Sequence, residues 1–400
     1  MSALYFYDDA RARQFEPFAL TRPGSELRAG TSLIRKRWER ATSLESAGFI
    51  SSPHLAHFEE GKAPPAVAPK TEIPAGSIVV NTRCVIPLDL TFDRFDLLMC
   101  EGVACAVRLA RGVPVSQFAD GSLDLGTIQT SLGGRRITGR WINEVWDFIA
   151  TLPEQLAEDI PRRAKALEAT KLTDATLVGS EKVFVEEGAE IGPHVVLDAT
   201  AGPILIRKGA VVAPFTHLVG PVAVGHDSRI LGDRVAASSI GDHCKVHGEF
   251  SNSIVLGHSN KTHGGFVGHS YIGRWVNLGA LTTTSNMKNT YGPIQLWTPS
   301  GLRSTGQQFL GTMFGDHAKT GIGTMLSTGT VIGAGANVFG ANTPPKVVPP
   351  FAWGDAAPYD TYDVARFLVV VERAMARRNV ELGDKARKQL AEAHQRRWST

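Results

Sequence analysis

Five histidines lie close together in the middle of the chain, and amide and amine side chains follow them. The histidines are His243, His247, His258, His263 and His269. A histidine titrates near neutral pH and can therefore take a proton from an amine or a hydroxyl group. This group is suited to proton abstraction beside a bound acyl donor, so the chemistry that we expect first is acyl transfer.

The segment that must position these side chains is a run of hexapeptides from about residue 190 to residue 340. Its repeated step is an aliphatic residue followed by glycine, as in Ile240-Gly241, Ile272-Gly273 and Ile332-Gly333. Such a step near a period of six indicates a parallel β-helix. We expect the aliphatic side chains to point into the prism. Gly or Asp should occupy the corners, where a side chain would clash or a positive φ is required.

The composition shifts along the chain predict four regions. Residues 1–140 form an α/β domain, with strands expected at 4–7, 77–81 and 103–109 and a helix at 30–42. Residues 141–175 are a helical connector that Pro153 and Pro161 interrupt. The β-helix occupies 176–350, and an arm at 288–308 leaves the prism. Helices follow in 351–400, one with an apolar face over 364–375 and a charged one from 384 to 397.

The overall composition favours a soluble cytoplasmic protein. Of the 400 residues 43% are hydrophobic and 20% are charged, which are globular values. The net charge is +3 and no dense basic stripe occurs, which argues against a nucleic-acid partner. The four cysteines have neither zinc-like nor disulfide spacing, as expected of reduced thiols. The first residues do not resemble a signal peptide, and no stretch is long and apolar enough for membrane insertion.

One segment of the β-helix has a specific family resemblance. The sequence SNKTHGGFVGHSYIG at 259–273 is similar to the acyltransferase half of the bifunctional N-acetylglucosamine-1-phosphate uridyltransferase / glucosamine-1-phosphate acetyltransferase, and so is Gly279-Ala280 followed by Asn286. Almost the whole chain resembles a divergent bacterial branch of that family, whose members combine a sugar nucleotidyltransferase with a hexapeptide-repeat acyltransferase domain. Its landmarks here are LTRP at 20–23, GDHAKTG at 315–321, TGTV at 328–331, FAWG at 351–354 and ARRN at 376–379.

The resemblance implies a left-handed β-helix, catalytic residues and substrates. It identifies His263 as the general base and Asn286 as the residue that contacts the amino-sugar. The implied reaction moves an acetyl group from acetyl-CoA, as co-substrate, to an amino-sugar similar to glucosamine 1-phosphate. Backbone N–H groups would hold the oxyanion, and no acyl-enzyme is required. The family also implies a homotrimer with sites between neighbouring prisms, and a role in nucleotide-sugar synthesis for the cell envelope.

Three further residues are candidates for binding the substrate or CoA, namely His269, Lys288 and Lys319. The lysines would meet CoA phosphates or be solvated charges. His269 would relay a proton or form a structural hydrogen bond, and Asn286 is also compatible with a structural asparagine ladder. One departure concerns the phosphate. The family has a phosphate-binding lysine twelve residues before the base, where this chain has Ser251.

The N-terminal domain resembles a degenerate sugar nucleotidyltransferase. Arg13, Thr21 and Arg22 are its candidate nucleotide-binding residues, since they stand near the family's arginine and Pro-Leu-Thr positions. The glycine-rich loop that would hold a triphosphate is replaced by the residues at 8–13, and the expected metal-binding Asp is not evident. Two interpretations therefore stay open: sugar-1-phosphate nucleotidyl transfer giving UDP-N-acetylglucosamine or a related nucleotide sugar, which would need Mg²⁺, and a remnant binding domain.

Two other functional classes also stay open. Some hexapeptide proteins are zinc carbonic anhydrases, and His258 and His263 have the five-residue spacing of two of their ligands, with His226 or His243 as the third. The other alternative is a non-catalytic trimeric scaffold. In the acyltransferase interpretation no resident metal is expected.

Overall fold

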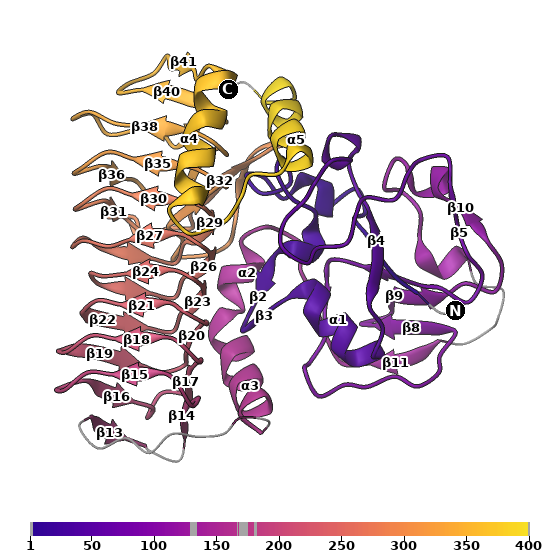
Figure 1. Ribbon diagram of the computed structural model, residues 1–400, viewed down its shortest axis with the longest axis horizontal. Helices are drawn as coiled ribbons and strands as arrows, with labels where there is room; N and C mark the ends of the chain where they lie inside the picture. The colour runs from indigo at the N-terminus through magenta and orange to yellow at the C-terminus, as the bar shows by residue number, and fades with distance from the viewer. Residues whose placement is uncertain (1–2, 129–133, 166, 168–174, 180–181, 399–400) are drawn as a thin grey trace. The chain divides into compact units, whose positions relative to one another are not determined.

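The computed structural model describes residues 3–128, 134–165, 167, 175–179 and 182–398. The chain divides into two compact units, which we describe separately. The first unit comprises residues 1–147 and 382–396, and the second comprises residues 148–381 and 397–400. Figure 1 gives the labels of the helices and strands.

A mixed six-stranded sheet forms the centre of the first unit, in the order β11-β8-β9-β6-β1-β4. Its strands are β1 Leu4–Tyr7, β4 Ser46–Ile50, β6 Ile78–Asn81, β8 Leu97–Cys100, β9 Val103–Arg108 and β11 Arg135–Ile137. Strand β1 is parallel to β4 and β6, whereas β9 is antiparallel to β6 and β8. Strands β1, β6 and β9 confirm the three predicted strands, and most of their apolar side chains are buried, with Val103 at the start of β9 an exposed exception.

Short elements surround this sheet. They are the strand pairs β2 Arg28–Ala29 with β3 Ser32–Leu33, β5 Glu72–Ile73 with β10 Val113–Pro114, and β7 Cys84–Val85 with β12 Arg140–Trp141, and the 3₁₀ helices η1 Ala12–Gln14, η2 Gly24–Glu26, η3 Pro53–Leu55, η4 Val115–Phe118 and η5 Leu125–Thr127. Helix α1 covers Ile34–Thr42, so it begins later than the predicted residue 30. The reason is that residues 32–33 pair as a strand with residues 28–29. All four cysteines are buried free thiols.

The second unit is a parallel β-helix whose coils visit three faces in turn. Face 1 contains β13 Thr176–Val178, β16 Val196–Asp198, β19 Thr216–Val219, β22 Asp233–Ala236, β25 Phe250–Ser251 and β28 Val267–Gly268, with the pair β31 Thr283–Thr284 and β36 Met325–Leu326 beyond them. Face 2 contains β14 Val183–Val185, β17 Ile204–Ile206, β20 Val222–Val224, β23 Ser239–Asp242, β26 Ile254–Gly257, β29 Tyr271–Arg274, β34 Thr312–Phe314, β37 Thr330–Ile332 and β39 Val347–Val348.

Face 3 carries the site described below. It contains β15 Glu190–Ile191, β18 Val211–Val212, β21 Arg229–Ile230, β24 Lys245–Val246, β27 Asn260–Lys261, β30 Asn277–Leu278, β35 Lys319–Thr320, β38 Asn337–Val338, β40 Ala352–Gly354 and β41 Asp360–Thr361. Neighbouring strands within each face are parallel, except for the antiparallel pair β40–β41. The predicted boundary at residue 350 therefore lies inside the sheet, which continues to Thr361.

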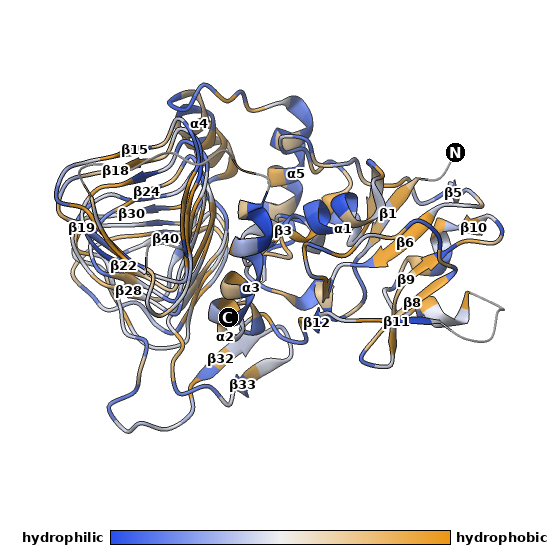
Figure 2. Cartoon of the chain, turned by 90° about the horizontal axis from the view of Figure 1, so that it is seen from below, coloured by the Kyte–Doolittle hydropathy of each residue, from blue (hydrophilic) through white to orange (hydrophobic). Residues whose placement is uncertain are grey.

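The side chains that fill the interior of the prism are mostly aliphatic, as the hexapeptide pattern predicts. Figure 2 shows that hydrophobic and hydrophilic residues are interspersed along the coils. The corner glycines serve close packing between coils. A Cβ atom at Gly241 would lie 2.3 Å from the carbonyl oxygen of Leu256, so only glycine fits. Positive φ instead falls two residues later, for example at His243 with φ 57°. Of the two predicted reasons for glycine at this position, the steric clash is therefore the one that applies. The positive φ is adopted by a different residue of the corner.

Helices cover two faces of the β-helix. Helices α2 (Asp147–Ala150) and α3 (Leu152–Ala164) replace the single interrupted connector helix, and the ring of Phe148 meets that of Tyr271 on face 2 at 5.5 Å. Residue 141, where the predicted connector begins, is instead the second residue of strand β12. Helix α4 (Val364–Ala376) lies along face 3, where Arg378, just beyond its end, donates a hydrogen bond to Asn260. Helix α5 (Asp384–Gln395) belongs to the first unit.

The predicted arm at 288–308 is confirmed as an excursion from the coils. It contains the antiparallel hairpin of β32 (Gln295–Thr298) and β33 (Gly301–Ser304). The coil resumes at β34, which pairs with β29 across this insertion. The insertion lengthens one coil without changing the order of the faces.

Candidate functional site

The five central histidines do not form one patch, because they lie at different corners of the prism. We name each corner by the faces that it joins. His243 and His258 follow strands of face 2 and lie at corner 2–3, whereas His269 follows β28 and lies at corner 1–2. His247 and His263 follow strands of face 3 and lie at corner 3–1. The acyl-transfer chemistry predicted for the group must therefore be examined corner by corner.

Corner 2–3 carries a stack of aromatic rings on successive coils. Its members are His243, His258, Trp275 and His317, with φ values of 57°, 54°, 61° and 61°. Their ring centroids are separated by 4.7, 4.3 and 6.4 Å along the series. Left-handed backbone disfavours residues other than glycine, and contacts between the rings offset part of this cost. These histidines are thus corner residues of the β-helix.

Corner 1–2 holds Asn286 and His269 together. The Nδ2 atom of Asn286 lies 2.9 Å from Nδ1 of His269, so the amide donates and the imidazole nitrogen accepts. The ring of Phe309 stacks on that of His269, with the ring centroids 5.2 Å apart. Burial lowers the pKa of His269 to about 4, so the ring is neutral at physiological pH. Asn286 therefore contacts His269, and it does not line the pocket that contains His263.

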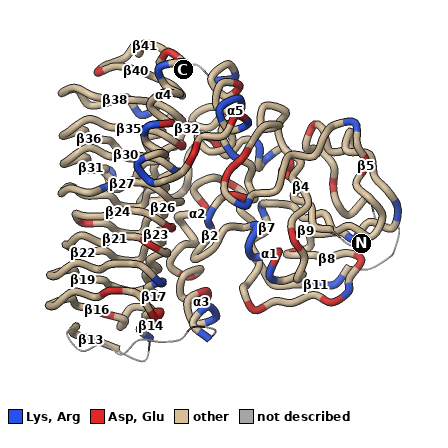
Figure 3. Tube along the Cα trace, viewed as in Figure 1, with Lys and Arg blue, Asp and Glu red and all other residues tan. Residues whose placement is uncertain are grey.

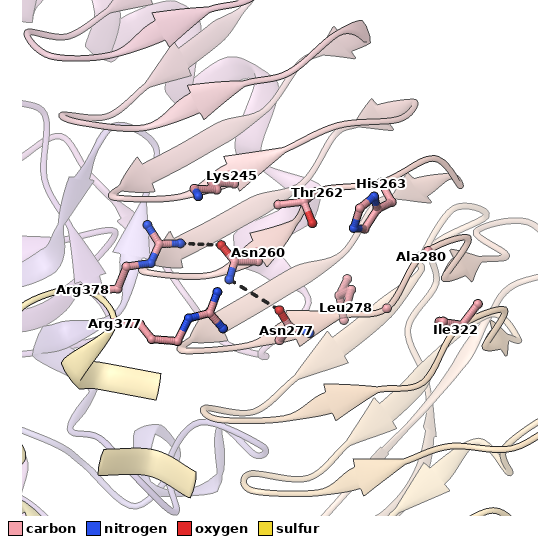
Figure 4. A pocket seen from close by; sticks show the side chains of 11 residues that line it. Lys245, Asn260, Thr262, His263, Asn277, Leu278, Ala280, Ile322, Arg377 and Arg378 are labelled. Carbon is pink, nitrogen blue, oxygen red and sulfur yellow. Dashed lines mark hydrogen bonds between the residues drawn. The ribbon is translucent and has the colours of Figure 1, made fainter. Parts of the chain in front are cut away.

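Corner 3–1 exposes the side chain of His263 to a pocket of about 580 Å³ (Figure 4). The turn that carries it is held from inside the prism by Lys261, which is only 2% exposed. The ammonium group of Lys261 donates to the carbonyl oxygens of His263, Gly264 (2.8 Å) and His247 (3.3 Å). Burial lowers the pKa of Lys261 to about 8. A buried lysine thus fixes the backbone of the predicted base.

The floor of this pocket is a row of polar side chains on face 3. Lys245, Asn260 and Asn277 are aligned on neighbouring strands, and the amide of Asn260 donates to Asn277 at 3.4 Å. Arg377 and Arg378 reach the pocket from the end of helix α4. The remaining wall is small or apolar and consists of Thr262, Leu278, Gly279, Ala280 and Ile322. The pocket lies within the size range of small-molecule sites.

The two candidate lysines lie in different surroundings. Lys319 belongs to the same row as Asn277 on face 3 and lines a second cavity of about 250 Å³ under helix α4. Burial lowers its pKa to about 8. Lys288 is in the arm, and its ammonium group donates to the carbonyl oxygen of Pro293. The sequence therefore predicted one lysine beside the pocket and one outside it.

All three candidate nucleotide-binding residues are held within the first unit. Arg13 donates to the backbone carbonyls of Asp8, Phe118 and Ala119. Arg22 forms an ion pair with Glu60 at 2.8 Å, and their side chains are only 3% and 16% exposed. Thr21 is buried. Arg13, Thr21 and Arg22 therefore have structural roles in this unit.

The buried carboxylate of Asp8 explains why the LTRP segment at 20–23 is held at the end of β1. It accepts hydrogen bonds from the hydroxyl of Thr82 at 2.5 Å and from the N–H of Gly24 at 3.1 Å. Its neighbour Asp9 forms an ion pair with Arg83 at 2.8 Å. The carboxylates at this strand end therefore bind protein groups.

Comparison with known proteins finds one family model and several curated relatives that match part of the chain. The family described as sugar nucleotidyl transferase matches residues 4–167. A bifunctional protein GlmU of Synechococcus sp. (strain JA-3-3Ab) is 28% identical over 231 residues, which cover 51% of this chain and 33% of the relative. A second GlmU, from Methanococcus vannielii, is 26% identical over 223 residues, covering 53% and 46% of the two chains. These matches make the chain a divergent relative of GlmU proteins by similarity, with a sugar nucleotidyl transferase match in its N-terminal part.

The GlmU-like chain spans between a third and a half of the length of these curated relatives. A shorter match joins it to a bifunctional sugar-1-phosphate nucleotidylyltransferase/acetyltransferase of Sulfurisphaera tokodaii, with 31% identity over 91 residues and 23% of each chain covered. Among solved structures, an Arabidopsis UDP-N-acetylglucosamine acyltransferase matches with 11% identity and a TM-score of 0.25, over 52% of this chain and 82% of the other.

The zinc alternative is not assembled in the described part of this GlmU-like chain, where no group of three or more His, Cys, Asp or Glu side chains could hold a metal ion. His258 and His263 lie at different corners, and Nδ1 of His258 accepts from Arg274 at 2.8 Å. Among the described residues, no helix is long and apolar enough to cross a membrane.

Sequence reasoning missed the residues that share the pocket with His263. Lys245, Asn260 and Asn277 each lie between two buried residues, and their signal was the repetition of polar residues at the same coil position. Arg377 and Arg378 belong to the ARRN landmark at 376–379, which carried no stated role. No local signal connects that landmark with corner 3–1.

Proposed function

We propose that this chain is an acyltransferase that moves an acetyl group from acetyl-CoA to the amine of an amino-sugar similar to glucosamine 1-phosphate. The observation that carries the proposal is the exposed His263 in a preformed pocket, on a turn that Lys261 holds in place. The similarity to GlmU proteins supports the choice of reaction. Since such a reaction uses cytosolic acetyl-CoA, we place it in the cytoplasm.

In the proposed step, His263 accepts a proton from the substrate amine while the nitrogen attacks the thioester carbonyl. The new N–C bond forms, the C–S bond breaks, and the CoA sulfur leaves and takes up a proton. Ala280 lines the pocket wall, and its N–H donates to no described residue, so we propose it as the donor to the oxyanion. Asn286 as the group that orients the amine stays a prediction.

Association along corner 3–1 is part of the proposal. Large apolar side chains are exposed at several turns of this corner: Leu281 (60%), Ile322 (76%) and Phe339 (37%) on three successive coils, and Phe215 (76%) on an earlier coil. A row of exposed apolar residues is typical of a protein–protein contact. We propose that neighbouring prisms of a homotrimer meet along this row, beside His263.

The test is release of free CoA thiol from acetyl-CoA, with glucosamine 1-phosphate and a panel of amino-sugars as acceptors. His263→Ala should lower kcat by roughly a hundredfold or more, because it removes the general base. His217→Ala on face 1 is the matched control and should retain activity. Full activity in H263A would overturn the assignment of the base. If the native protein releases no thiol with any acceptor of the panel, the non-catalytic scaffold is favoured.

Sugar-1-phosphate nucleotidyl transfer by the first unit is the second candidate, favoured by the family match over 4–167. It requires a nucleoside triphosphate and Mg²⁺, and it releases pyrophosphate. The test measures pyrophosphate release from UTP with N-acetylglucosamine 1-phosphate and Mg²⁺. Because Arg13 and Arg22 are bound within the fold, activity would have to depend on other residues or on their release.

A further inference from the structure

Basic side chains from two distant parts of the chain meet at one end of the His263 pocket. Lys245 and Arg229 are aligned on neighbouring strands of face 3, and Arg377 and Arg378 reach the same place from the end of helix α4. Figure 3 shows basic residues where this end of α4 meets the strands of face 3. Figure 4 shows Lys245, Arg377 and Arg378 on one side of the pocket and His263 on the other.

The charge in this pocket is not balanced by the protein. Among the described residues that line it, none is acidic. Neither Lys245 nor Arg377 forms an ion pair with a described residue, and Arg378 donates only to the neutral amide of Asn260, at 2.6 Å. Burial lowers the pKa of Lys245, and repulsion from Arg378, Arg229 and Arg377 lowers it further. Positive side chains that are held close together despite their electrostatic repulsion are typical of an anion-binding site.

The position of the cluster bears on the missing family lysine. Ser251, which stands at that lysine's place, lies on face 1, whereas the basic cluster lies on face 3. We propose that Lys245, Arg377 and Arg378 form a phosphate-binding subsite that replaces the lost lysine. The ligand is a phosphate ester whose phosphate lies between these side chains while its reacting group lies at His263. The inference rests on the proposed acyl transfer, since it concerns the same pocket.

Two reactants could supply the phosphate. A sugar 1-phosphate would place the acceptor's phosphate in the subsite, and acetyl-CoA would place a phosphate of the donor there. Both present the same group to the three cations. Arginine forks bind phosphate in two-pronged geometry, and charge-assisted hydrogen bonds are the strong class, so each cation should contribute measurably.

Calorimetric binding distinguishes these sources. The ligands are glucosamine 1-phosphate against glucosamine, and acetyl-CoA against S-acetylpantetheine, which has no phosphate. Lys245→Gln and Arg377→Gln should each weaken the phosphate-bearing ligand roughly tenfold or more and leave its partner without the phosphate unchanged. The difference should shrink at high salt, since Arg377 is exposed. If the variants weaken binding of glucosamine 1-phosphate, the subsite binds the phosphate of the acceptor. If they weaken binding of acetyl-CoA, it binds a phosphate of the donor.

Arg366→Gln is the matched control, because Arg366 is an exposed arginine in the first turn of the same helix. Unchanged affinities in K245Q and R377Q would overturn the subsite, as would the absence of any thermal stabilisation of the native protein by these ligands or by inorganic pyrophosphate. Thiol release separates the two proposals. If ligand binding depends on Lys245 but no thiol is released, the phosphate subsite is supported and acyl transfer is contradicted. If thiol is released and the variants do not change its rate, acyl transfer is supported and the subsite is contradicted.

Discussion

At the residue scale, Asn286 and His269 form a pair whose protonation is set by burial. The imidazole accepts from an amide at 2.9 Å, and its low pKa of about 4 leaves it neutral. Neither residue shares the pocket of His263. In a single chain their chemistry is therefore separate from that of the proposed base.

Asn286→Asp should raise the pKa of His269. The substitution places a carboxylate beside Nδ1, and a nearby negative charge favours the imidazolium form. An NMR titration of the histidine side chains would measure the shift. Asn289→Asp, three residues further in the exposed part of the arm, is the control. An unchanged titration of His269 would contradict the contact between the two side chains.

Lys261 occupies an interior position where neighbouring coils carry Val246 and Leu278. Its pKa falls from 10.5 to about 8, so the unfolded chain holds the extra proton between these two values. Stability from this group therefore rises as the pH increases from about 8 to 10.5, and the charged form costs stability below pH 8.

Lys261→Met removes this titration. The stability of the native protein relative to K261M should rise from pH 8 to pH 10, by up to roughly 1.4 kcal/mol per pH unit. Urea denaturation at several pH values would measure it. The same variant should lower kcat, because the carbonyl of His263 loses its donor. A stability difference that does not change with pH would show that Lys261 does not titrate in this range.

At the element scale, the LTRP segment illustrates how a family landmark can have a structural role. Loop 20–24 is fixed to the ends of β1 and β6 by Asp8 and Thr82, and Arg22 in this loop is paired with Glu60. A side chain bound in this way is not free to contact a nucleotide without breaking the ion pair.

Arg22→Gln should therefore destabilise the first unit by roughly 2–4 kcal/mol, because it leaves a partly buried carboxylate without its partner. Thermal and urea unfolding would measure the loss, with the exposed Arg40→Gln on helix α1 as control. If R22Q is as stable as R40Q and loses nucleotide binding instead, Arg22 is a ligand-binding residue.

At the scale of the whole molecule, the proposed trimer depends on the apolar row of corner 3–1. Phe215→Glu combined with Leu281→Glu places two charges in that row. Since both side chains are exposed in the single chain, the fold should survive while association is lost. Sedimentation equilibrium would measure the mass, and circular dichroism would check the fold. A double variant of unchanged mass would place the interface elsewhere.

The sequence by itself determined the β-helix, because each coil repeats the same local requirement: an aliphatic residue for the interior and a small one for the corner. Apolar runs likewise predicted the strands at 4–7, 77–81 and 103–109. His263 was selected by the family motif around it, and its catalytic role stays a prediction. The predicted bounds of helix α1 and of the connector were less accurate. Residues 28–29 pair with 32–33, and β12 pairs with β7, and the local sequence pattern does not reveal these strand partners.

Only the tertiary structure decided which side chains meet. Paired residues are 21 positions apart at Ile191 and Val212 but 15 apart at Val246 and Lys261, so a histidine's place in the sequence does not give its corner. Because the coils differ in length, His263 and Asn286 lie at different corners of the prism. The approach of Arg377 and Arg378 to Lys245 follows from the packing of α4 on face 3, which depends on contacts between residues far apart in the chain.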